Sequence, residues 1–324
     1  MGRTVGRSRS RKLTESELQD MFRVIVVGKF DGIHLAHRAL LREGRRLSQI
    51  LGASFMVFTF PLKKDALIPN EVRYELLREH ADEVEVVSLE EIAELPPEDF
   101  LELLSREYGA KAIVMGPGHR FGKGRSGDPD LARRWGKEKG VTVRVLRPLL
   151  CQGRPISSRH IREALRGGRI GEAALSLGHH PALYGTRTEG VRLGRALGFP
   201  TVNLELPREL LRPKEGVYVA YAFWEGGHGR GLFYLGRRPT FPDLPPSAEI
   251  HFLDPPGRDP EGMIEVQLLE YLRGDIRFPS ADALKKQIKA DISRAEGIFE
   301  ETLIPRPLHP AFRKLFQNGG VGAL

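Results

Sequence analysis

The chain has 324 residues, enough for about two domains, and 40% of them are hydrophobic and 28% charged. A single cysteine, Cys151, excludes an internal disulfide framework, and no apolar run approaches the ~20 residues of a membrane helix. The net charge of +8 and the isoelectric point of about 9.6 indicate anionic partners such as nucleotides.

Residues 1–20 form a basic arm that we expect to be disordered. The arm lacks the apolar core of a signal peptide, and the lone cysteine fits a reducing compartment, so we expect a cytoplasmic protein without membrane association. Loose contact of the arm with RNA is an alternative, but nucleic acid is not the expected partner.

Residues 21–179 alternate short apolar runs with longer amphipathic segments, a pattern typical of βαβ units and a parallel sheet. The predicted strands are 23–27, 55–60, 83–87, 111–115 and 141–145. The predicted helices are 37–51, 70–81, 98–108 and 129–139. Ligands of such sheets bind at the carboxyl ends of the strands.

Residues 180–303 have closely spaced apolar or alternating runs with proline- and glycine-rich turns, which favours an antiparallel barrel. The predicted strands are 217–223, 231–235, 248–253 and 264–271. An amphipathic helix over 281–299, with Leu284, Ile288 and Ile292 on one face, closes this domain. Residues 304–324 are a C-terminal tail.

The first strand runs into a glycine-containing turn at the start of a helix, where free amides and the helix dipole favour anions. The candidate residues are Gly28, Phe30, Asp31, Gly32, His34 and His37. Two histidines three residues apart in the sequence can face one ligand. An imidazolium ring at this position would stabilise charge on a phosphate. A metal-binding pair or two surface histidines are the alternatives.

A second candidate site holds Thr201 and Asn203, whose side chains share one face of an extended segment. Their neutral oxygens suit a magnesium ion that carries ATP phosphates. The preceding loop contains Gly190, Gly194 and Arg195, where backbone amides and a guanidinium can approach a triphosphate. A plain turn followed by a strand explains the spacing equally well.

The run GRALGFPTVNLEL, followed by GVYV, LGRRPTF at 235–241 and AEIHFLD at 248–254, resembles the riboflavin kinase family over about residues 182–300. The resemblance implies that Thr201 and Asn203 hold magnesium and the nucleotide. It also implies that Glu249 is the general base for the riboflavin 5′-hydroxyl. Arg273 then contacts the flavin, although a salt bridge is the plainer account. For Glu249 the alternative is a charged residue on an open strand face.

Residues 28–37 resemble the nucleotidyltransferase signature of bacterial FAD synthetases, and the resemblance spans about residues 21–177. It continues in the glycine-rich stretch 115–128 and in Ile156-Ser-Ser-Arg-His-Ile-Arg162. It implies that His34 and His37 stabilise the transition state and that Ser158 and Arg162 hold phosphates. The whole chain therefore resembles the bifunctional riboflavin kinase/FMN adenylyltransferase family, with a Rossmann-like domain before a barrel domain.

The implied reactions are phosphorylation of riboflavin to FMN and adenylylation of FMN to FAD, with ATP, flavin and Mg²⁺ as the small-molecule partners. Residues that depart from the family pattern of the first domain include Ala36, Gly118, His119 and Arg159. They leave open a kinase with an inactive first domain. A flavin- or RNA-binding regulator is an alternative of another class.

Overall fold

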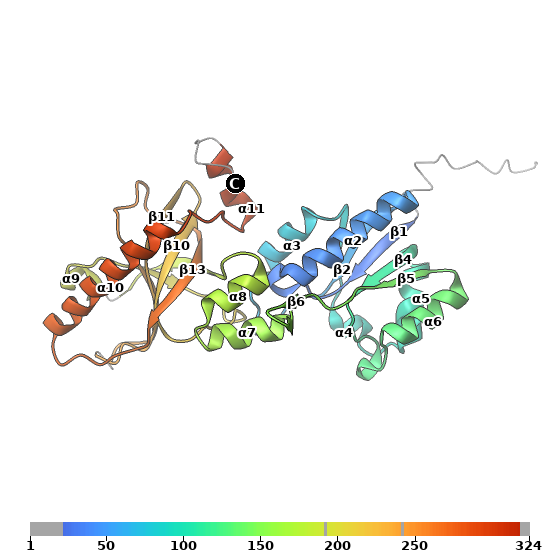
Figure 1. The fold of residues 1–324 in the computed structure, drawn as a ribbon, viewed down its shortest axis with the longest axis horizontal. Helices are drawn as coiled ribbons and strands as arrows, with labels where there is room; N and C mark the ends of the chain where they lie inside the picture. Colours follow the sequence, from blue (N-terminus) through green and yellow to red (C-terminus); the bar gives the residue numbers. More distant parts are fainter. Residues whose placement is uncertain (1–21, 191–192, 241–242, 318–324) are drawn as a thin grey trace, which may run out of the picture. The chain divides into compact units, whose positions relative to one another are not determined.

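The computed structural model describes residues 22–190, 193–240 and 243–317 (Figure 1). The basic arm expected over 1–20, and Phe241 of the LGRRPTF motif, lie outside these residues. Within the described ranges, no helix is long and apolar enough to cross a membrane.

The chain folds into two compact units whose segments alternate along the sequence. One unit holds the chain up to Gly28, Ala39–Phe60 and His80–Arg147. The other holds Lys29–Arg38, Pro61–Glu79 and everything from Pro148 onward. The loop that follows the first strand is therefore packed with the C-terminal part of the chain, although it is close to the sheet in sequence.

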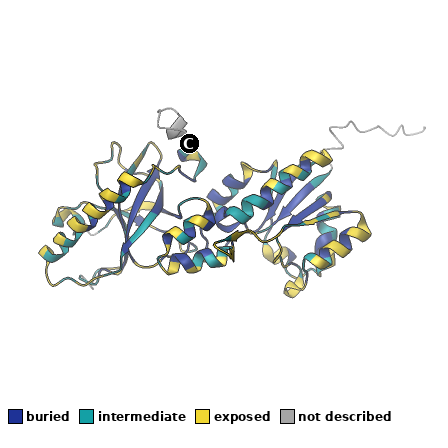
Figure 2. Cartoon of the chain, in the orientation of Figure 1, coloured by how far each residue is buried: buried dark blue, intermediate teal, exposed yellow. Residues whose placement is uncertain are grey.

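The first unit is built on a five-stranded parallel sheet, which confirms the predicted parallel sheet, and the strand order is β3-β2-β1-β4-β5. The three central strands β2, β1 and β4 are buried along most of their length (Figure 2). The strands are β1 (Arg23–Val27), β2 (Ser54–Thr59), β3 (Glu83–Val86), β4 (Ala110–Met115) and β5 (Thr142–Val145). The helices are α2 (Leu35–Leu51), which begins in the other unit, α4 (Leu89–Ile92), α5 (Pro97–Arg106), η2 (Lys123–Arg125) and α6 (Pro129–Lys139).

Local signals explain why the bounds of α6 could be predicted from sequence. The Asp128 side chain accepts hydrogen bonds from the backbone N–H groups of Asp130 and Leu131, which caps the helix. Pro129 occupies the first turn, and Gly140 ends the helix in a left-handed conformation.

The second unit contains a closed antiparallel barrel in the order β10-β11-β12-β9-β8-β13, which confirms the predicted barrel. The strands are β8 (Ala182–Thr188), β9 (Val202–Glu205), β10 (Gly216–Trp224), β11 (Gly227–Gly236), β12 (Ser247–Phe252) and β13 (Met263–Arg273). The other elements are η1 (Asp31–Ile33), α3 (Asn70–Arg78), β6 (Leu150–Cys151), β7 (Arg154–Pro155), α7 (Ser158–Arg166), α8 (Ile170–Leu177), α9 (Leu193–Leu197), α10 (Ala281–Glu301) and α11 (Pro310–Gln317).

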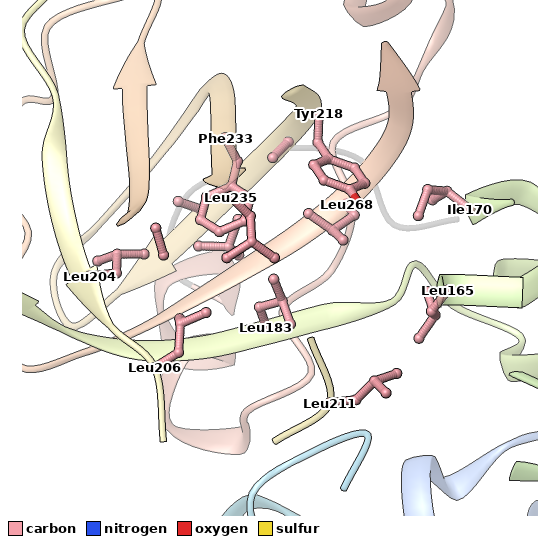
Figure 3. Packing of buried hydrophobic residues seen from close by; sticks show 14 of the residues in the cluster. Leu165, Ile170, Leu183, Leu204, Leu206, Leu211, Tyr218, Phe233, Leu235 and Leu268 are labelled. Carbon is pink, nitrogen blue, oxygen red and sulfur yellow. The ribbon is translucent and has the colours of Figure 1, made fainter. Parts of the chain in front are cut away.

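The side chains of the barrel strands contribute to two hydrophobic cores, one inside the barrel and one between its outer face and α10. Alternate residues such as Phe233, Ile250 and Leu268 fill the barrel, and Leu165 and Ile170 of the α7–α8 pair belong to the same cluster (Figure 3). The intervening residues face outward, where Val219 and Phe223 pack with Phe299 of α10. The outward face is therefore where polar side chains of the barrel can meet a ligand.

Several elements were not predicted, among them β8, β9, α8 and α11. The sequence of β8 alternates weakly and contains Gly185, β9 is only four residues long, and α8 is short with Gly171 in its first turn. Helix α11 lies within the expected tail, and Leu308 and Phe312 are buried there. The backbone N–H groups of Leu308 and His309 each donate 2.8 Å hydrogen bonds to the buried carboxylate of Glu265 in β13.

We predict that replacing Leu268 by alanine destabilises the barrel, because Leu268 is 1% exposed inside it. The free energy of unfolding should fall by about 2–5 kcal/mol in chemical denaturation. Leu303→Ala is the matched control, because Leu303 is 72% exposed, and it should change that free energy by less than about 0.5 kcal/mol. Equal effects of the two substitutions would contradict the barrel core described above.

Candidate active sites

The register of the barrel places the polar candidates in one row across its outer face. Tyr234 of β11 pairs with Glu249 of β12, Glu249 pairs with Asn203 of β9, and Asn203 pairs with Thr188 of β8. Directly paired residues of antiparallel strands project to the same side. Asn203 and Glu249, which are 46 positions apart in the sequence, are thus neighbours.

Glu249 has an asymmetric environment. Its side chain is 17% exposed, and its Oε2 accepts a 2.9 Å hydrogen bond from the Thr201 hydroxyl and lies 3.5 Å from Nη2 of Arg238. None of the described residues bonds to Oε1. Glu249 therefore has one occupied oxygen and one available for a ligand.

Two cavities meet at Thr201. One, of about 150 Å³, is largely apolar and is lined by Leu232, Phe278, Leu284 and Ile288, with Glu249 in its wall. The other, of about 450 Å³, is polar and is lined by Gly190, Arg195 and Asn203. A flat apolar molecule in the first and an anionic one in the second would meet beside Glu249 and Thr201.

The glycines of the loop before β9 permit close approach of backbone to side chains. A Cβ at Gly190 would clash with the Asn203 side chain, and a Cβ at Gly194 would clash with the carbonyl oxygen of Phe199. Arg195, in α9, is exposed at the polar cavity. The structure thus brings Gly190, Arg195, Thr201 and Asn203 to one cavity, while Gly194 lines the other.

Arg273 lies at the end of β13 in the wall of the apolar cavity. Its Nε and Nη2 donate to Oδ2 of Asp291 in α10 at 2.9 and 2.8 Å. The side chains of Arg273 and Asp291 are 17% and 7% exposed, so this ion pair is largely buried. Arg273 therefore joins α10 to the barrel at the cavity.

The donor set at Thr201 and Asn203 fits a magnesium ion that arrives with a nucleotide. The Thr201 hydroxyl gives its hydrogen to Glu249 and keeps its lone pairs for a metal. Asn203 adds an amide oxygen. Both ligands are neutral, so phosphate oxygens would supply the anionic ligands.

The loop that follows β1 forms a second site, which lies within the unit that contains the barrel. Phe30 is buried in a left-handed conformation (φ 51°), and Gly32 has φ 78° with Leu67 2.7 Å from the position of a Cβ. Asp31 is 2% exposed, and its Oδ1 accepts a 2.8 Å hydrogen bond from Leu67 N. Gly28, at the end of β1, belongs to the other unit and donates to Phe58 O at 3.1 Å.

Ser158 and Arg162 of α7 contact this loop. The Ser158 hydroxyl donates to Asp31 O at 3.0 Å, and Nη2 of Arg162 forms an ion pair with Oδ2 of Asp31. Burial raises the pKa of Asp31, and Arg162 opposes part of that rise. The carboxylate of Asp31 therefore positions Arg162.

His34 and His37 stack with their ring centroids 3.5 Å apart. Nδ1 of His34 accepts a 3.3 Å hydrogen bond from the backbone N of His37, so the neutral ring carries its proton on Nε2. Burial lowers the pKa of His34 to about 4 and lowers the pKa of His37. The expected imidazolium pair is therefore corrected to two neutral imidazoles.

The residues that depart from the family pattern differ in their surroundings. Arg159 is 89% exposed and pairs with Glu163 at 3.0 Å, so it leaves the contacts of Ser158 and Arg162 unchanged. Ala36 lies half-buried in the first turn of α2. Gly118 has no atom within 4 Å of a would-be Cβ, and it lies in the other unit.

Two arginines beside these sites were missed by the sequence analysis. Arg238 lies next to Glu249, has φ 54° and is 8% exposed. Arg73 of α3 is 0% exposed, and it donates to Lys29 O in the loop after β1. Nothing in the sequence distinguishes them from surface arginines, because their burial depends on contacts distant in the chain.

Comparison with known proteins supplies the context of both sites. A family model described as riboflavin kinase matches residues 177–299, and one described as FAD synthetase matches residues 17–160. The chain is similar to the bifunctional riboflavin kinase/FMN adenylyltransferase of Escherichia coli K12, with 33% identity over 85% of this chain and 92% of that protein. The Haemophilus influenzae protein of the same name is 30% identical, over 85% of this chain and 94% of its own length.

Among solved structures, the chain is similar to one from Streptococcus pneumoniae titled macrolide-efflux protein. The TM-score is 0.74 at 25% identity, with 86% of this chain and 97% of that chain covered.

We predict that the two histidines make stability depend on pH. In the unfolded chain they take up protons near pH 6.5, and in the folded protein His34 does so only near pH 4, so the free energy of unfolding should fall between these values as pH decreases. One proton contributes at most about 1.4 kcal/mol per pH unit. His34→Gln should flatten this slope in denaturation curves recorded from pH 7 to 4.

Exposed His228 gives the matched control, and His34→Gln should flatten the slope relative to His228→Gln. The raised pKa of Asp31 acts in the opposite direction in all three proteins. An unchanged slope in His34→Gln would contradict the buried neutral state of His34.

Proposed function

The chain belongs to the bifunctional riboflavin kinase/FMN adenylyltransferase family, and we propose how its two sites carry the two reactions. It phosphorylates riboflavin to FMN with ATP, and it adenylylates FMN to FAD with release of pyrophosphate. The alternative of a kinase with an inactive first domain is not supported, because the FAD synthetase model matches residues 17–160 and full-length relatives carry both names.

The division of the chain that we propose follows the two activities. Residues 21–179 form the adenylyltransferase domain and 180–303 the riboflavin kinase domain, with the basic arm before and the tail after them. The segments 29–38 and 61–79 nevertheless pack in the unit that contains the barrel, so the adenylyltransferase loop and the barrel belong to one compact unit.

The kinase proposal rests on one observation, the meeting of an apolar and a polar cavity at Thr201 beside Glu249. Riboflavin occupies the apolar cavity, and the ATP phosphates lie in the polar one against Gly190, Arg195 and Asn203. A magnesium ion held by Thr201 and Asn203 neutralises charge on the β- and γ-phosphates when bound.

Glu249 then acts as the general base. Its Oε1 accepts the proton of the riboflavin 5′-hydroxyl as the hydroxyl oxygen bonds to the γ-phosphorus, and the bond from that phosphorus to the β–γ bridging oxygen breaks. FMN and ADP result. Arg273 shapes the flavin cavity through its ion pair with Asp291.

In the adenylyltransferase site an oxygen of the FMN phosphate attacks the α-phosphorus of ATP, and pyrophosphate leaves. Nε2–H of His34 donates to the phosphates, and His37 supports the ring by stacking. The backbone of Phe30 and Gly32 borders the site. An ionised Asp31 repels phosphate, so it contributes by holding Arg162, whose remaining N–H groups face the anions. Ser158 supports the loop through its hydrogen bond to Asp31 O.

The direct test is a chromatographic time course with purified protein, riboflavin, ATP and magnesium. We expect FMN first and then FAD with pyrophosphate. FMN that accumulates without FAD, even when FMN is supplied, would remove the second activity from the proposal. Absence of FMN would contradict the kinase site.

We predict that Glu249→Gln lowers kcat for riboflavin phosphorylation by about 10²–10⁴-fold, because the amide cannot accept the proton. Adenylylation of supplied FMN should remain at the wild-type rate, which shows that the variant is folded. Glu270→Gln is the matched control, since Glu270 pairs with Arg294 at the surface of the barrel, and it should retain both activities. A fully active Glu249→Gln kinase would contradict its role as base.

We predict the converse for His34→Asn, which removes the Nε2 donor. Adenylylation of FMN should fall by about 10²-fold or more, and riboflavin phosphorylation should be unchanged. Arg159→Ala should keep both activities, because that side chain is exposed and directed to Glu163. A loss in Arg159→Ala as large as in His34→Asn would show that Arg159 is a phosphate ligand.

A further inference from the structure

Arg238 is a buried, conformationally constrained arginine beside Glu249. The role inferred for Arg238 rests on the proposed function of Glu249 as the general base. It follows β11 with φ 54°, a left-handed conformation that non-glycine residues seldom adopt. Its backbone N donates a 2.7 Å hydrogen bond to the Tyr234 hydroxyl, which fixes the turn at the wall of the cavity.

The guanidinium has few partners for a buried cation. Its side chain is 7% exposed; Nη1 donates to Pro245 O at 3.0 Å, and Nη2 lies 3.5 Å from Oε2 of Glu249. Nε is buried and has no hydrogen-bond partner among the described residues. Burial of a cation is costly unless it is paired, and Glu249 is the carboxylate with which it pairs.

Thr201 and Arg238 approach the same oxygen of Glu249. Both contacts are made to Oε2: Thr201 lies just before β9 and Arg238 just after β11. Oε1 receives no contact from the described residues. A carboxylate fixed through one oxygen presents the other in a defined direction. The geometry therefore restricts Glu249 to one orientation in the cavity.

We propose that Arg238 is a positioning residue for phosphoryl transfer, which holds Oε2 of Glu249 so that Oε1 faces the riboflavin hydroxyl. The neighbouring Arg237 provides a contrast, because its side chain is 78% exposed and its ion pair with Glu215 measures 3.6 Å. The two adjacent arginines differ in burial and partner but share charge and size, which makes them a matched pair.

The test compares Arg238→Gln with Arg237→Gln in the full-length protein. Arg238→Gln should lower kcat for riboflavin phosphorylation by about 10–100-fold and change KM for ATP by less than about threefold. Arg238→Lys should restore part of the loss. Arg237→Gln should leave kcat unchanged, and adenylylation of supplied FMN should be unchanged in every variant.

A double-mutant cycle with Glu249→Gln separates positioning from a structural role. If Arg238 acts through Glu249, Arg238→Gln should cost almost nothing further in the Glu249→Gln background. Additive losses, or an Arg238→Gln enzyme as fast as Arg237→Gln, would overturn the inference and leave the proposed function intact. Full kinase activity of Glu249→Gln alone would remove the proposed base and this inference together.

If Arg238→Gln lowers both activities, the folding of that variant is impaired. The kinase kcat of Arg238→Lys then decides between a positioning role and a structural role for Arg238. A reduced kinase kcat with normal adenylylation in that variant supports the proposal. A wild-type kinase kcat in it overturns the proposal, because an ammonium cannot reproduce the fixed geometry of the guanidinium.

Discussion

The register of the closed barrel is the constraint on which the proposed kinase site depends. Interior residues such as Phe233 and Ile250 fill the barrel, and their neighbours Tyr234 and Glu249 must then face outward. A slip of one residue would exchange the two faces and place the carboxylate of Glu249 in the apolar interior. Closure of the six strands removes free edges that could shift, so packing inside the barrel fixes chemistry outside it. Glu249 and Asn203 need no direct bond to each other, because the paired backbones of β12 and β9 already place them side by side.

The proposed adenylyltransferase site depends instead on the ion pair between Asp31 and Arg162. Asp31 and Arg162 are 131 residues apart, and their contact ties the loop after β1 to helix α7. The loop includes left-handed residues at Phe30 and Ile33, a conformation that persists where the surroundings hold it. Leu67 and Ser158 add hydrogen bonds to the same aspartate. Desolvation by this packing also keeps His34 neutral, so the features that shape the loop set the protonation of a residue proposed to face phosphate.

The sequence was sufficient for the fold class and for residues whose roles are local. Asp128, Pro129 and Gly140 carry the bounds of α6, and the two-residue spacing of Thr201 and Asn203 indicates a shared face. Val202 between them packs against the barrel interior, as alternation requires. Long-range features could not be predicted. The burial of Arg238 depends on Pro245 and Glu249, the neutral state of His34 depends on packing, and the buried Glu265 meets Leu308 from a segment expected to be a tail.

Each site contains one carboxylate paired with one arginine. The two carboxylates differ in how many of their oxygens already have partners in the protein. Each oxygen of Asp31 already has a partner, one Leu67 N and the other Arg162, so neither oxygen is free of protein contacts. Glu249 receives Thr201 and the more distant Arg238 on a single oxygen. The adenylyltransferase reaction needs no general base, since the attacking FMN phosphate is already anionic, whereas a flavin hydroxyl must lose a proton. The distribution of hydrogen bonds over the two carboxylates thus matches the proton requirement of each reaction.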